Sequence, residues 1–276
     1  MYRKTALISG GTSGVGLSIV KELADIGYDV FFIGSDTRKG KNIEKQLAPQ
    51  SFGTITFIPL DLSKPEEVNA FASAFVKKNN KLDLLANIAG VIYPNRTETT
   101  GGIEKTFAIG YLSAFILSQK LIPALQNGSA ARIINVSANP KTILEPNISF
   151  DDLNYNKAYN GFKASINTIH AKTVLTSILS EQLRQQGIDV NCFHPGMVRS
   201  NLSRHMPMPL KLVAAILQAF MSKSAANGVY VCSAQDIQGV TGQLFVGKKP
   251  IPLQFSDDYK TQLWNYSHKM VNGILK

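Results

Sequence analysis

The sequence predicts an α/β fold in which helices cover both faces of a parallel sheet. Short apolar runs alternate with longer segments of helical periodicity along the chain, and such alternation is typical of parallel sheets. A glycine-rich stretch, residues 9–16, joins the first apolar run to the first helical segment. Because the sequence contains no linker, repeat or low-complexity tract, we expect a single domain over residues 1–276.

Seven apolar runs rich in branched and aromatic residues fit strands that are buried on both faces of such a sheet. In chain order they are Lys4–Ser9, Asp29–Gly34, Thr54–Ile58, Leu82–Asn87, Arg132–Ser137, Ile188–Phe193 and Gly242–Val246. Between and after them, apolar residues recur with the spacing of amphipathic helices. The helical segments are Val15–Ile26, Thr37–Leu47, Pro65–Lys78, Ile103–Leu125, Lys157–Gln186 and Asp258–Val271.

The composition, 44% hydrophobic and 17% charged residues, is that of a globular protein. No apolar run reaches the length of a membrane span. The apolar stretch at the N-terminus is shorter than a signal peptide and continues into the glycine-rich turn, so we expect a cytoplasmic protein. The net charge of +10 fits a solvated surface, with an acidic partner, a membrane surface or the phosphates of a cofactor as alternatives. No basic cluster with interleaved aromatic residues indicates nucleic-acid binding.

The two cysteines, Cys192 and Cys232, lie in apolar segments, where buried thiols are more common than a disulfide. The spacing of cysteines and histidines matches no metal-binding pattern, so we expect no metal site.

The glycine-rich turn predicts a site for a dinucleotide. Its glycines have the spacing Gly-x-x-x-Gly-x-Gly, which permits a tight bend and a close approach of the backbone to a pyrophosphate. The helix that follows offers its N-terminal amides to the phosphates. The expected contacts are Gly10, Thr12, Ser13, Gly14, Val15 and Gly16.

The end of the second predicted strand favours NADP(H) over NAD(H). An acidic residue at this tip binds the ribose hydroxyl of NAD and repels the phosphate of NADP, but the tip here is Gly34. Ser35 and Arg38 follow, and both are expected to bind the phosphate. Asp36 stands just before a helical segment and is interpreted as a helix cap. NAD(H) is the alternative, with Asp36 as the ribose ligand.

Tyr159 and Lys163 are the candidate catalytic pair, because residues four apart on a helix share one face. An ammonium beside a phenol favours the phenolate, and lowering a Tyr pKa from about 10 towards 7 needs roughly 4 kcal/mol. Tyr159 would then exchange a proton with a carbonyl or alcohol substrate while the cofactor moves a hydride. Lys163 would also hold the nicotinamide ribose. The predicted function is therefore that of an oxidoreductase.

These motifs together resemble the short-chain dehydrogenases/reductases. Asp61 and Leu62 are similar to the family's adenine-side element, and Asn87-Ile88-Ala89-Gly90 to its Asn-Asn-Ala-Gly element. Tyr159 and Lys163 resemble its catalytic pair. The segment that closes over the nicotinamide in the family resembles the stretch that contains Pro195, Gly196, Val198 and Ser200. The resemblance implies that residues from all four motifs bind the cofactor. They are Asp61, Leu62, Asn87, Ala89, Gly90, Tyr159, Lys163, Pro195, Gly196, Val198 and Ser200.

Four further segments of the sequence are similar to those of one branch of this family, the retinol dehydrogenases. They are Ile148–Asn154, Asn201–Pro207, Gly239–Phe245 and Leu263–Ser267. The resemblance implies a single Rossmann-type doubly wound sheet of about seven strands. It also implies NADP(H)-linked oxidation or reduction of an apolar alcohol or carbonyl compound.

Two positions depart from the family's pattern: Ala138 stands where the family has a catalytic Ser, and Gly110 where it has an Asn. Loss of one donor at a developing oxyanion typically costs about 10²–10³ in rate. Three interpretations stay open. Asn139, Ser137 or Tyr155 replaces the Ser; the substrate polarises itself; or the protein is a non-redox enzyme or an NADP(H)-binding module with little turnover.

The expected substrate pocket is apolar and suits a bulky or aromatic compound. Its candidate residues are Tyr93, Ala138, Asn139, Tyr155, Met197 and Met206. The segment around 200–222 is apolar almost all round, which fits a buried helix, a lid over the substrate, a membrane-surface contact or a subunit interface. The protein is expected to be a monomer or a homodimer.

Overall fold

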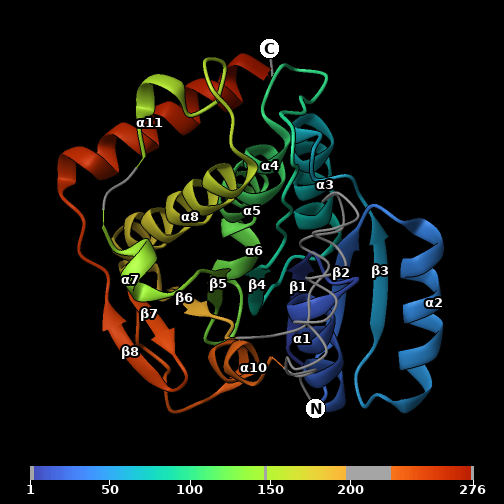
Figure 1. The fold of residues 1–276 in the computed structure, drawn as a ribbon. Helices are drawn as coiled ribbons and strands as arrows, with labels where there is room; N and C mark the ends of the chain where they lie inside the picture. Colours follow the sequence, from blue (N-terminus) through green and yellow to red (C-terminus); the bar gives the residue numbers. More distant parts are fainter. Residues whose placement is uncertain (1–2, 146–147, 197–224, 275–276) are drawn as a thin grey trace.

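The computed structural model describes residues 3–145, 148–196 and 225–274, and contains a mostly parallel sheet of eight strands (Figure 1). The strand order is β3-β2-β1-β4-β5-β6-β7-β8. The strands are β1 Thr5–Ser9, β2 Asp29–Gly34, β3 Ile55–Pro59, β4 Leu84–Asn87, β5 Arg132–Val136, β6 Asp189–His194, β7 Gln243–Val246 and β8 Lys249–Pro252. The predicted α/β class and parallel sheet are confirmed. Both ends of each predicted strand lie within two residues of the ends of an observed strand.

The eighth strand, β8, is the one that the sequence did not reveal. It pairs antiparallel with β7 through a tight turn at Gly247, whose φ is +60°. β8 is mostly exposed and contains Pro250 and Pro252, so it lacks the apolar run of a buried strand. Proline is tolerated there because the strand is the last of the sheet.

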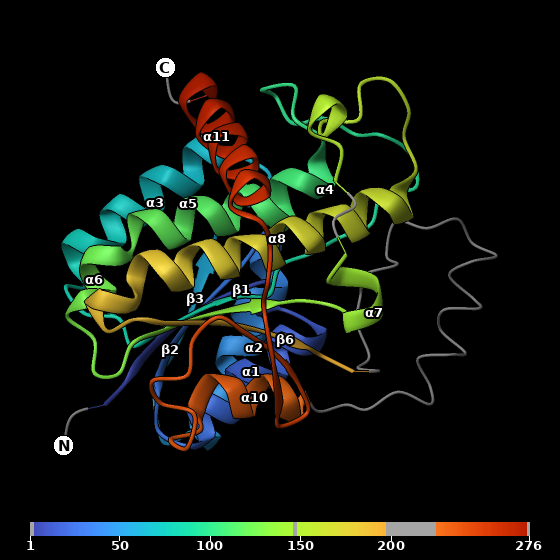
Figure 2. The ribbon, with the colours of Figure 1, turned by 90° about the vertical axis from the view of Figure 1, so that its left-hand side faces the viewer.

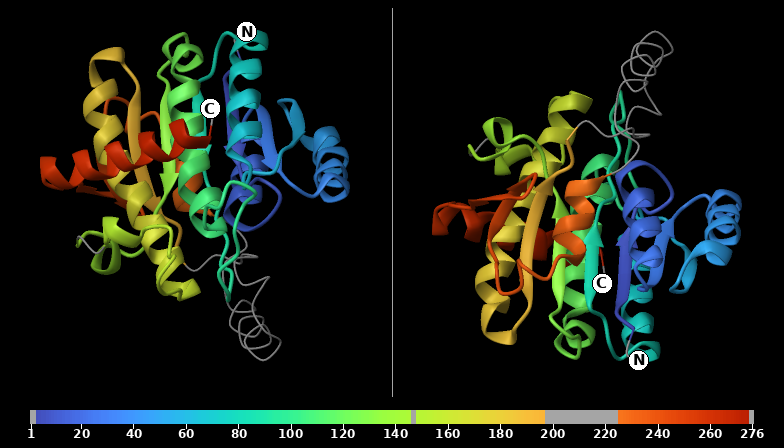
Figure 3. Two further views of the ribbon diagram at one scale, coloured as in Figure 1. Left: turned by 90° about the horizontal axis from the view of Figure 1, so that it is seen from above. Right: turned by 90° about the horizontal axis from the view of Figure 1, so that it is seen from below.

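Helices cover both faces of the sheet and form a separate apolar core on each (Figure 2). One face carries α3 Pro65–Lys78, α5 Ser113–Lys120, α6 Ile122–Gln126 and α8 Gly161–Leu183, and the other carries α1 Gly14–Asp25, α2 Thr37–Leu47 and α10 Ala226–Ser233. The helix α11 Asp257–Ile274 packs on α8 and α3 as an outer layer, which Figure 3 shows from above. Short turns complete the structure: η1 Ala48–Gln50, α7 Pro140–Ile143, η3 Phe150–Asp152 and η4 Arg184–Gln186.

The predicted helix Ile103–Leu125 is divided into several pieces. It begins as α4 Lys105–Phe107, continues as the π-helical turn η2 Ala108–Leu112, and leads into α5 and α6. Gly110 lies in the π turn against α8, where a Cβ atom at position 110 would lie 2.5 Å from Thr168 Cγ2. Single π turns inside helices are frequent at functional sites.

The helix α8 begins later than the sequence suggested. Its N-cap is Asn160, whose side chain accepts a hydrogen bond from the Lys163 amide, so the helix starts at Gly161 and not at Lys157. The expected segment around 200–222 lies outside the described residues, as do Met197, Val198, Ser200 and Met206. Among the helices that the structure describes, none combines the length and apolar character that crossing a membrane requires.

Candidate functional site

A cavity of about 310 Å³ lies at the carboxyl ends of the strands, where the glycine-rich turn, the ends of β2, β4 and β5, and the helix α8 meet. Open α/β sheets bind their ligands at this edge. Thirteen of the expected cofactor residues line it: Gly10, Thr12, Ser13, Gly14, Val15, Gly16, Ser35, Asp61, Leu62, Ala89, Gly90, Pro195 and Gly196. Arg38, Asn87, Tyr159 and Lys163 do not line it.

The glycine-rich turn packs so closely that side chains are excluded from its main positions. Gly10 has a φ of +71°, and a Cβ atom there would lie 2.8 Å from Ala89 Cα. A Cβ atom on Gly16 would lie 2.3 Å from the Gly10 oxygen. The Ser9 hydroxyl accepts hydrogen bonds from the amides of Ile88 and Ala89, at 3.1 and 3.3 Å, and so ties the turn to the end of β4.

The N-terminus of α1 opens into this cavity. Ser13 is its N-cap but makes no capping hydrogen bond with its side chain, so within the described part of the chain the amides of the first helical turn have no side-chain cap. Unpaired amides and the helix dipole together favour a phosphate. The bare backbone, the free helix end and the small lining residues fit the pyrophosphate of a dinucleotide.

The tip of β2 has no room for an acidic residue. A Cβ atom on Gly34 would lie 2.4 Å from Thr12 Cγ2, while the next residue, Ser35, lines the cavity. Asp36 caps α2, because its carboxylate accepts a hydrogen bond from the Lys39 amide at 2.9 Å. The interpretation of Asp36 as a helix cap is thus confirmed.

One face of α8 forms the cavity wall opposite the glycine-rich turn. Ser165, Thr168, Ile169 and Lys172 line it, with the spacing i, i+3, i+4 and i+7 of a single helix face. Thr106, Ile109, Gly110, Val136 and Ser137 complete this part of the wall. The Ser137 hydroxyl is hydrogen-bonded to that of Thr173, 2.7 Å away.

No tyrosine is among the residues that line the cavity, and of the nine tyrosines only Tyr2 lies outside the described part of the chain. Tyr159 precedes the N-cap of α8, so Tyr159 and Lys163 do not form an i, i+4 pair on one helix face. The helical spacing expected from the sequence is therefore wrong at this point, because Asn160 starts the helix after the tyrosine.

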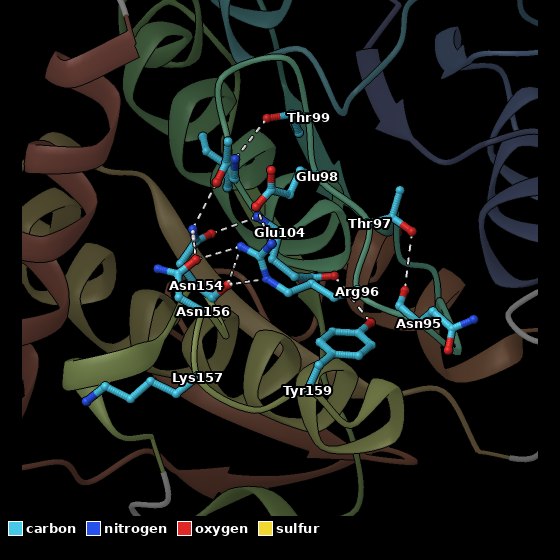
Figure 4. A network of polar contacts seen from close by, with 12 residues as sticks. Asn95, Arg96, Thr97, Glu98, Thr99, Glu104, Asn154, Asn156, Lys157 and Tyr159 are labelled. Atoms are coloured by element: carbon cyan, nitrogen blue, oxygen red, sulfur yellow. Dashed lines mark hydrogen bonds and ion pairs between the residues drawn. The ribbon is translucent and has the colours of Figure 1, made fainter.

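The Tyr159 hydroxyl lies in a polar network (Figure 4), and Tyr159 itself does not line the cavity, although its hydroxyl is 3.5 Å from that of the lining residue Thr106. The Tyr159 hydroxyl donates a hydrogen bond to the Tyr93 main-chain oxygen at 2.9 Å, and the Glu104 carboxylate lies 3.3 Å away. Burial raises the pKa of Tyr159, and the negative charge of Glu104 adds to this effect. The direction is opposite to the lowering that a proton donor activated by Lys163 would need.

This network ties two loops together. The Arg96 guanidinium donates to the Asn154 main-chain oxygen and, at 2.8 Å, to the Asn156 side chain, and it pairs with Glu98. Glu104 is fully buried and caps α4 by accepting hydrogen bonds from the amides of Thr106 and Phe107. Figure 4 shows these groups converging from the segments around 95–104 and 154–159. Tyr159 thus belongs to a structural clamp between the loops.

Four candidate substrate residues belong to the described part of the chain. Tyr93, Ala138, Asn139 and Tyr155 do not line the cavity. Asn139 caps the turn α7 through a hydrogen bond from the Lys141 amide. Tyr155 is buried, and its ring packs edge-on against Tyr159 with 5.8 Å between centroids. The described residues bring together no cluster of His, Cys, Asp or Glu that could hold a metal ion.

Lys172 is the cavity residue that the sequence reasoning missed. It is 1% exposed, and its ammonium donates to the main-chain oxygens of Ala89, at 3.2 Å, and Asn87, at 3.4 Å. Burial lowers its pKa to about 7. The one signal in the sequence is a lysine within an otherwise apolar helical stretch, Ala-Lys-Thr-Val-Leu.

Comparison with known proteins gives matches over the length of the chain. A family profile described as short chain dehydrogenase matches residues 4–210. Retinol dehydrogenase 14 of Mus musculus is 30% identical, with 100% of this chain and 88% of that protein covered. The short-chain dehydrogenase TIC 32 B, chloroplastic, of Brassica napus is 32% identical, with 98% and 89% covered.

Solved structures share the fold. The Pseudomonas aeruginosa RhlG/NADP active-site complex has a TM-score of 0.64 at 24% identity, covering 88% of this chain and 93% of that one. An uncharacterised protein from Mycobacterium paratuberculosis has a TM-score of 0.70 at 23% identity, covering 98% and 93%. At these identities the likeness supports the doubly wound architecture.

Proposed function

The chain belongs to the short-chain dehydrogenase family of oxidoreductases, and on that premise we propose that it binds NADP(H) in the cavity at the carboxyl edge of the sheet. The observation that carries this proposal is the glycine-rich turn. Its backbone leaves no room for side chains at Gly10 and Gly16, and it leads into the free N-terminus of α1. A pyrophosphate is the ligand that such a turn accommodates.

The proposed preference for NADP(H) rests on the tip of β2. An acidic side chain at position 34 would overlap with Thr12, so the usual ligand of the NAD ribose is absent there. Ser35 lies in the cavity wall and Arg38 in the first turn of α2, and both are able to donate hydrogen bonds to a phosphate. Calorimetric titration with NADPH and NADH tests the preference. Tighter binding of NADH would contradict it.

We further propose that cofactor binding is the principal activity and that hydride transfer is slow. When bound, the nicotinamide supplies or accepts the hydride, while the chain must deliver the proton. A positioned acid or base contributes about 10²–10⁴ to the rate. This part of the described wall offers the hydroxyls of Thr106, Ser137, Ser165 and Thr168 but no phenol, and an aliphatic hydroxyl is a much weaker acid.

A second candidate function is that of an NADP(H)-dependent dehydrogenase or reductase that acts on an apolar alcohol or carbonyl compound. The likeness to retinol dehydrogenase 14 over the whole chain favours it. In that case the substrate itself, or a serine hydroxyl of the wall with solvent, takes part in the proton transfer.

Single-turnover kinetics separate the two candidates. Enzyme loaded with NADPH is mixed with a panel of apolar aldehydes and ketones, and enzyme loaded with NADP with alcohols that include retinol, while cofactor absorbance is followed. A binding protein keeps its cofactor unchanged over many minutes with every compound. Rapid turnover of one compound would establish the dehydrogenase and identify its substrate class.

A further inference from the structure

The first turn of α8 exposes an aromatic side chain beside the cavity. Phe162 is 66% exposed, although Ser165, one turn later in the helix, lines the cavity. Among the described residues, the other large apolar side chains that are exposed, Ile26 and Phe52, belong to loops at the amino edge of the sheet. Transfer of an exposed phenylalanine from water to an apolar phase is favourable, so Phe162 is suited to contact with a partner.

Three lysines lie in the segments that meet at this turn. Lys157 and Lys163 are exposed and lie just before and within it. The start of α8 packs against Tyr93, since a Cβ atom on Gly161 would lie 2.0 Å from the Tyr93 oxygen. The Lys105 ammonium lies over the Tyr93 ring, 5.8 Å from its centroid. We call five residues of this surface the α8 rim: Tyr93, Lys105, Lys157, Phe162 and Lys163.

The positive charge of the α8 rim is not paired within the described part of the chain. None of the ion pairs there involves Lys105, Lys157 or Lys163. Lys163 lies in the first turn of α8, where the helix dipole disfavours a cation, so the stability of the helix does not account for it. Figure 4 shows Lys157 pointing away from the polar network around Arg96.

The acidic side chains of the adjoining loops are engaged elsewhere. Glu98 pairs with Arg96, and Glu104 is fully buried as the N-cap of α4. Asp152 attracts Lys157, but its carboxylate is held by two main-chain amides of its own loop. The α8 rim therefore presents an aromatic side chain within a positively charged surface.

We propose that the α8 rim docks on the surface of an anionic membrane. Phe162 inserts below the lipid headgroups, while the three lysines bind the phosphates and carboxylates of the headgroups. Aromatic side chains and lysines with long apolar stems are the groups that favour the interface of a bilayer. A second copy of this chain fits the same surface less well, because two positive rims would repel each other.

The docked orientation turns one side of the cavity toward the bilayer. Lys105 directly precedes Thr106 and Phe162 lies one turn before Ser165, and both Thr106 and Ser165 line the cavity. An apolar compound dissolved in the bilayer then approaches the cavity from the membrane. The contact itself involves no cofactor, so it is independent of the proposed function.

Sedimentation of the whole chain with vesicles tests the contact. Vesicles of phosphatidylcholine alone are compared with vesicles that contain about 30% of the anionic lipid phosphatidylserine. We expect binding to the anionic vesicles and binding to the neutral ones that is weaker by more than about tenfold. Salt at about 1 M should release the protein, because it screens charges beyond about 3 Å. Equal binding to both kinds of vesicle would overturn the proposal. Absence of binding would also overturn it, and would leave an acidic protein as the partner that the same charges fit.

Variants of the α8 rim assign the contact to its residues. Phe162→Ser should weaken binding to the anionic vesicles about tenfold, as the loss of a partly buried phenylalanine predicts. Lys157→Gln combined with Lys163→Gln should weaken it about 25-fold, since each lysine near an anionic surface contributes about fivefold. Dimerisation of the parent that Phe162→Ser abolishes would overturn the proposal in favour of a second copy.

Matched controls remove the same groups from the amino edge of the sheet. Phe52, which is 79% exposed, lies in the loop that leads into β3, and Phe52→Ser should bind vesicles as the parent does. Lys45→Gln combined with Lys78→Gln removes two exposed charges from the last turns of α2 and α3 and should also leave binding unchanged. Losses in these controls equal to those in the rim variants would refute the assignment to the α8 rim.

Discussion

Gly110 of the π turn and Thr168 of α8 are in direct contact, and a Cβ atom at position 110 would lie 2.5 Å from Thr168 Cγ2. The two residues are 58 positions apart in the chain, and both line the cavity. The glycine at this point of the helix is thus matched by the threonine that occupies the space.

Gly110→Ala should destabilise the fold by about 1–3 kcal/mol, the usual range for overpacking a core. Thr168→Ser removes the methyl group that causes the overlap and keeps the hydroxyl that donates to the Ala164 oxygen at 2.8 Å. The double variant should therefore recover most of the loss. Urea unfolding of the two single variants and the double variant measures the coupling. Strictly additive effects would show that the π turn absorbs the extra methyl group elsewhere.

Tyr159→Phe should leave cofactor binding and any hydride transfer unchanged and lower the free energy of unfolding by about 1 kcal/mol. The hydroxyl donates to the Tyr93 oxygen at 2.9 Å, and Tyr159 is not among the residues that line the cavity, although its hydroxyl lies 3.5 Å from that of the lining residue Thr106. Thermal melts and NADPH titrations of the variant test both parts. Lys163→Ala serves as the companion variant and should also retain activity. If Tyr159→Phe removed turnover while the fold stayed intact, the proton path would run through the clamp between the loops.

The sequence was sufficient to predict the sheet because buried parallel strands are continuous apolar runs, which short windows reveal. It located α2 to the residue, since Asp36 caps the helix. It failed at Tyr159, where a tyrosine and a lysine four apart imitate a helix pair. The Asn-Gly at 160–161 was the signal of a helix start. The position of Lys172 against Ala89 depends on tertiary packing, and no spacing in the sequence encodes it.

Arg38→Ala should weaken NADPH binding about tenfold and leave NADH binding unchanged, since a charge-assisted hydrogen bond to the extra phosphate contributes roughly 1.5–3 kcal/mol. Arg38 lies in the first turn of α2, next to Ser35 of the cavity wall. Lys45→Ala, in the last turn of the same helix, removes the same charge at a distance and is the control. Equal losses for the two variants would indicate a general electrostatic effect.

Lys172→Met should stabilise the protein at low pH while it weakens cofactor binding. The pKa of Lys172 is about 7 in the folded state and about 10.4 in an unfolded chain. Between these values the unfolded state binds more protons, so stability rises with pH. The burden of the buried charge is greatest below pH 7, roughly 5 kcal/mol, and disappears near pH 10. Urea unfolding at pH 6 and pH 9 should show a larger gain at pH 6. A gain independent of pH would mean that packing, not charge, is responsible.

Two pairs of residues four apart on α8 line the cavity, Ser165 with Ile169 and Thr168 with Lys172. A tyrosine and lysine pair can be placed at the first pair of positions without a change at Lys172. The double change Ser165→Tyr and Ile169→Lys should raise hydride transfer to apolar ketones by about 10²–10⁴, the usual contribution of a general acid. The parent, which keeps Tyr159 and Lys163 outside the cavity, is the built-in control. The cavity of about 310 Å³ must also accommodate the larger side chains, so cofactor affinity is measured beside the rate. A variant that binds NADPH as the parent does and still transfers no hydride would show that the missing proton donor is not what limits the reaction. The shape of the cavity at other lining positions, such as Gly110, would then be the cause.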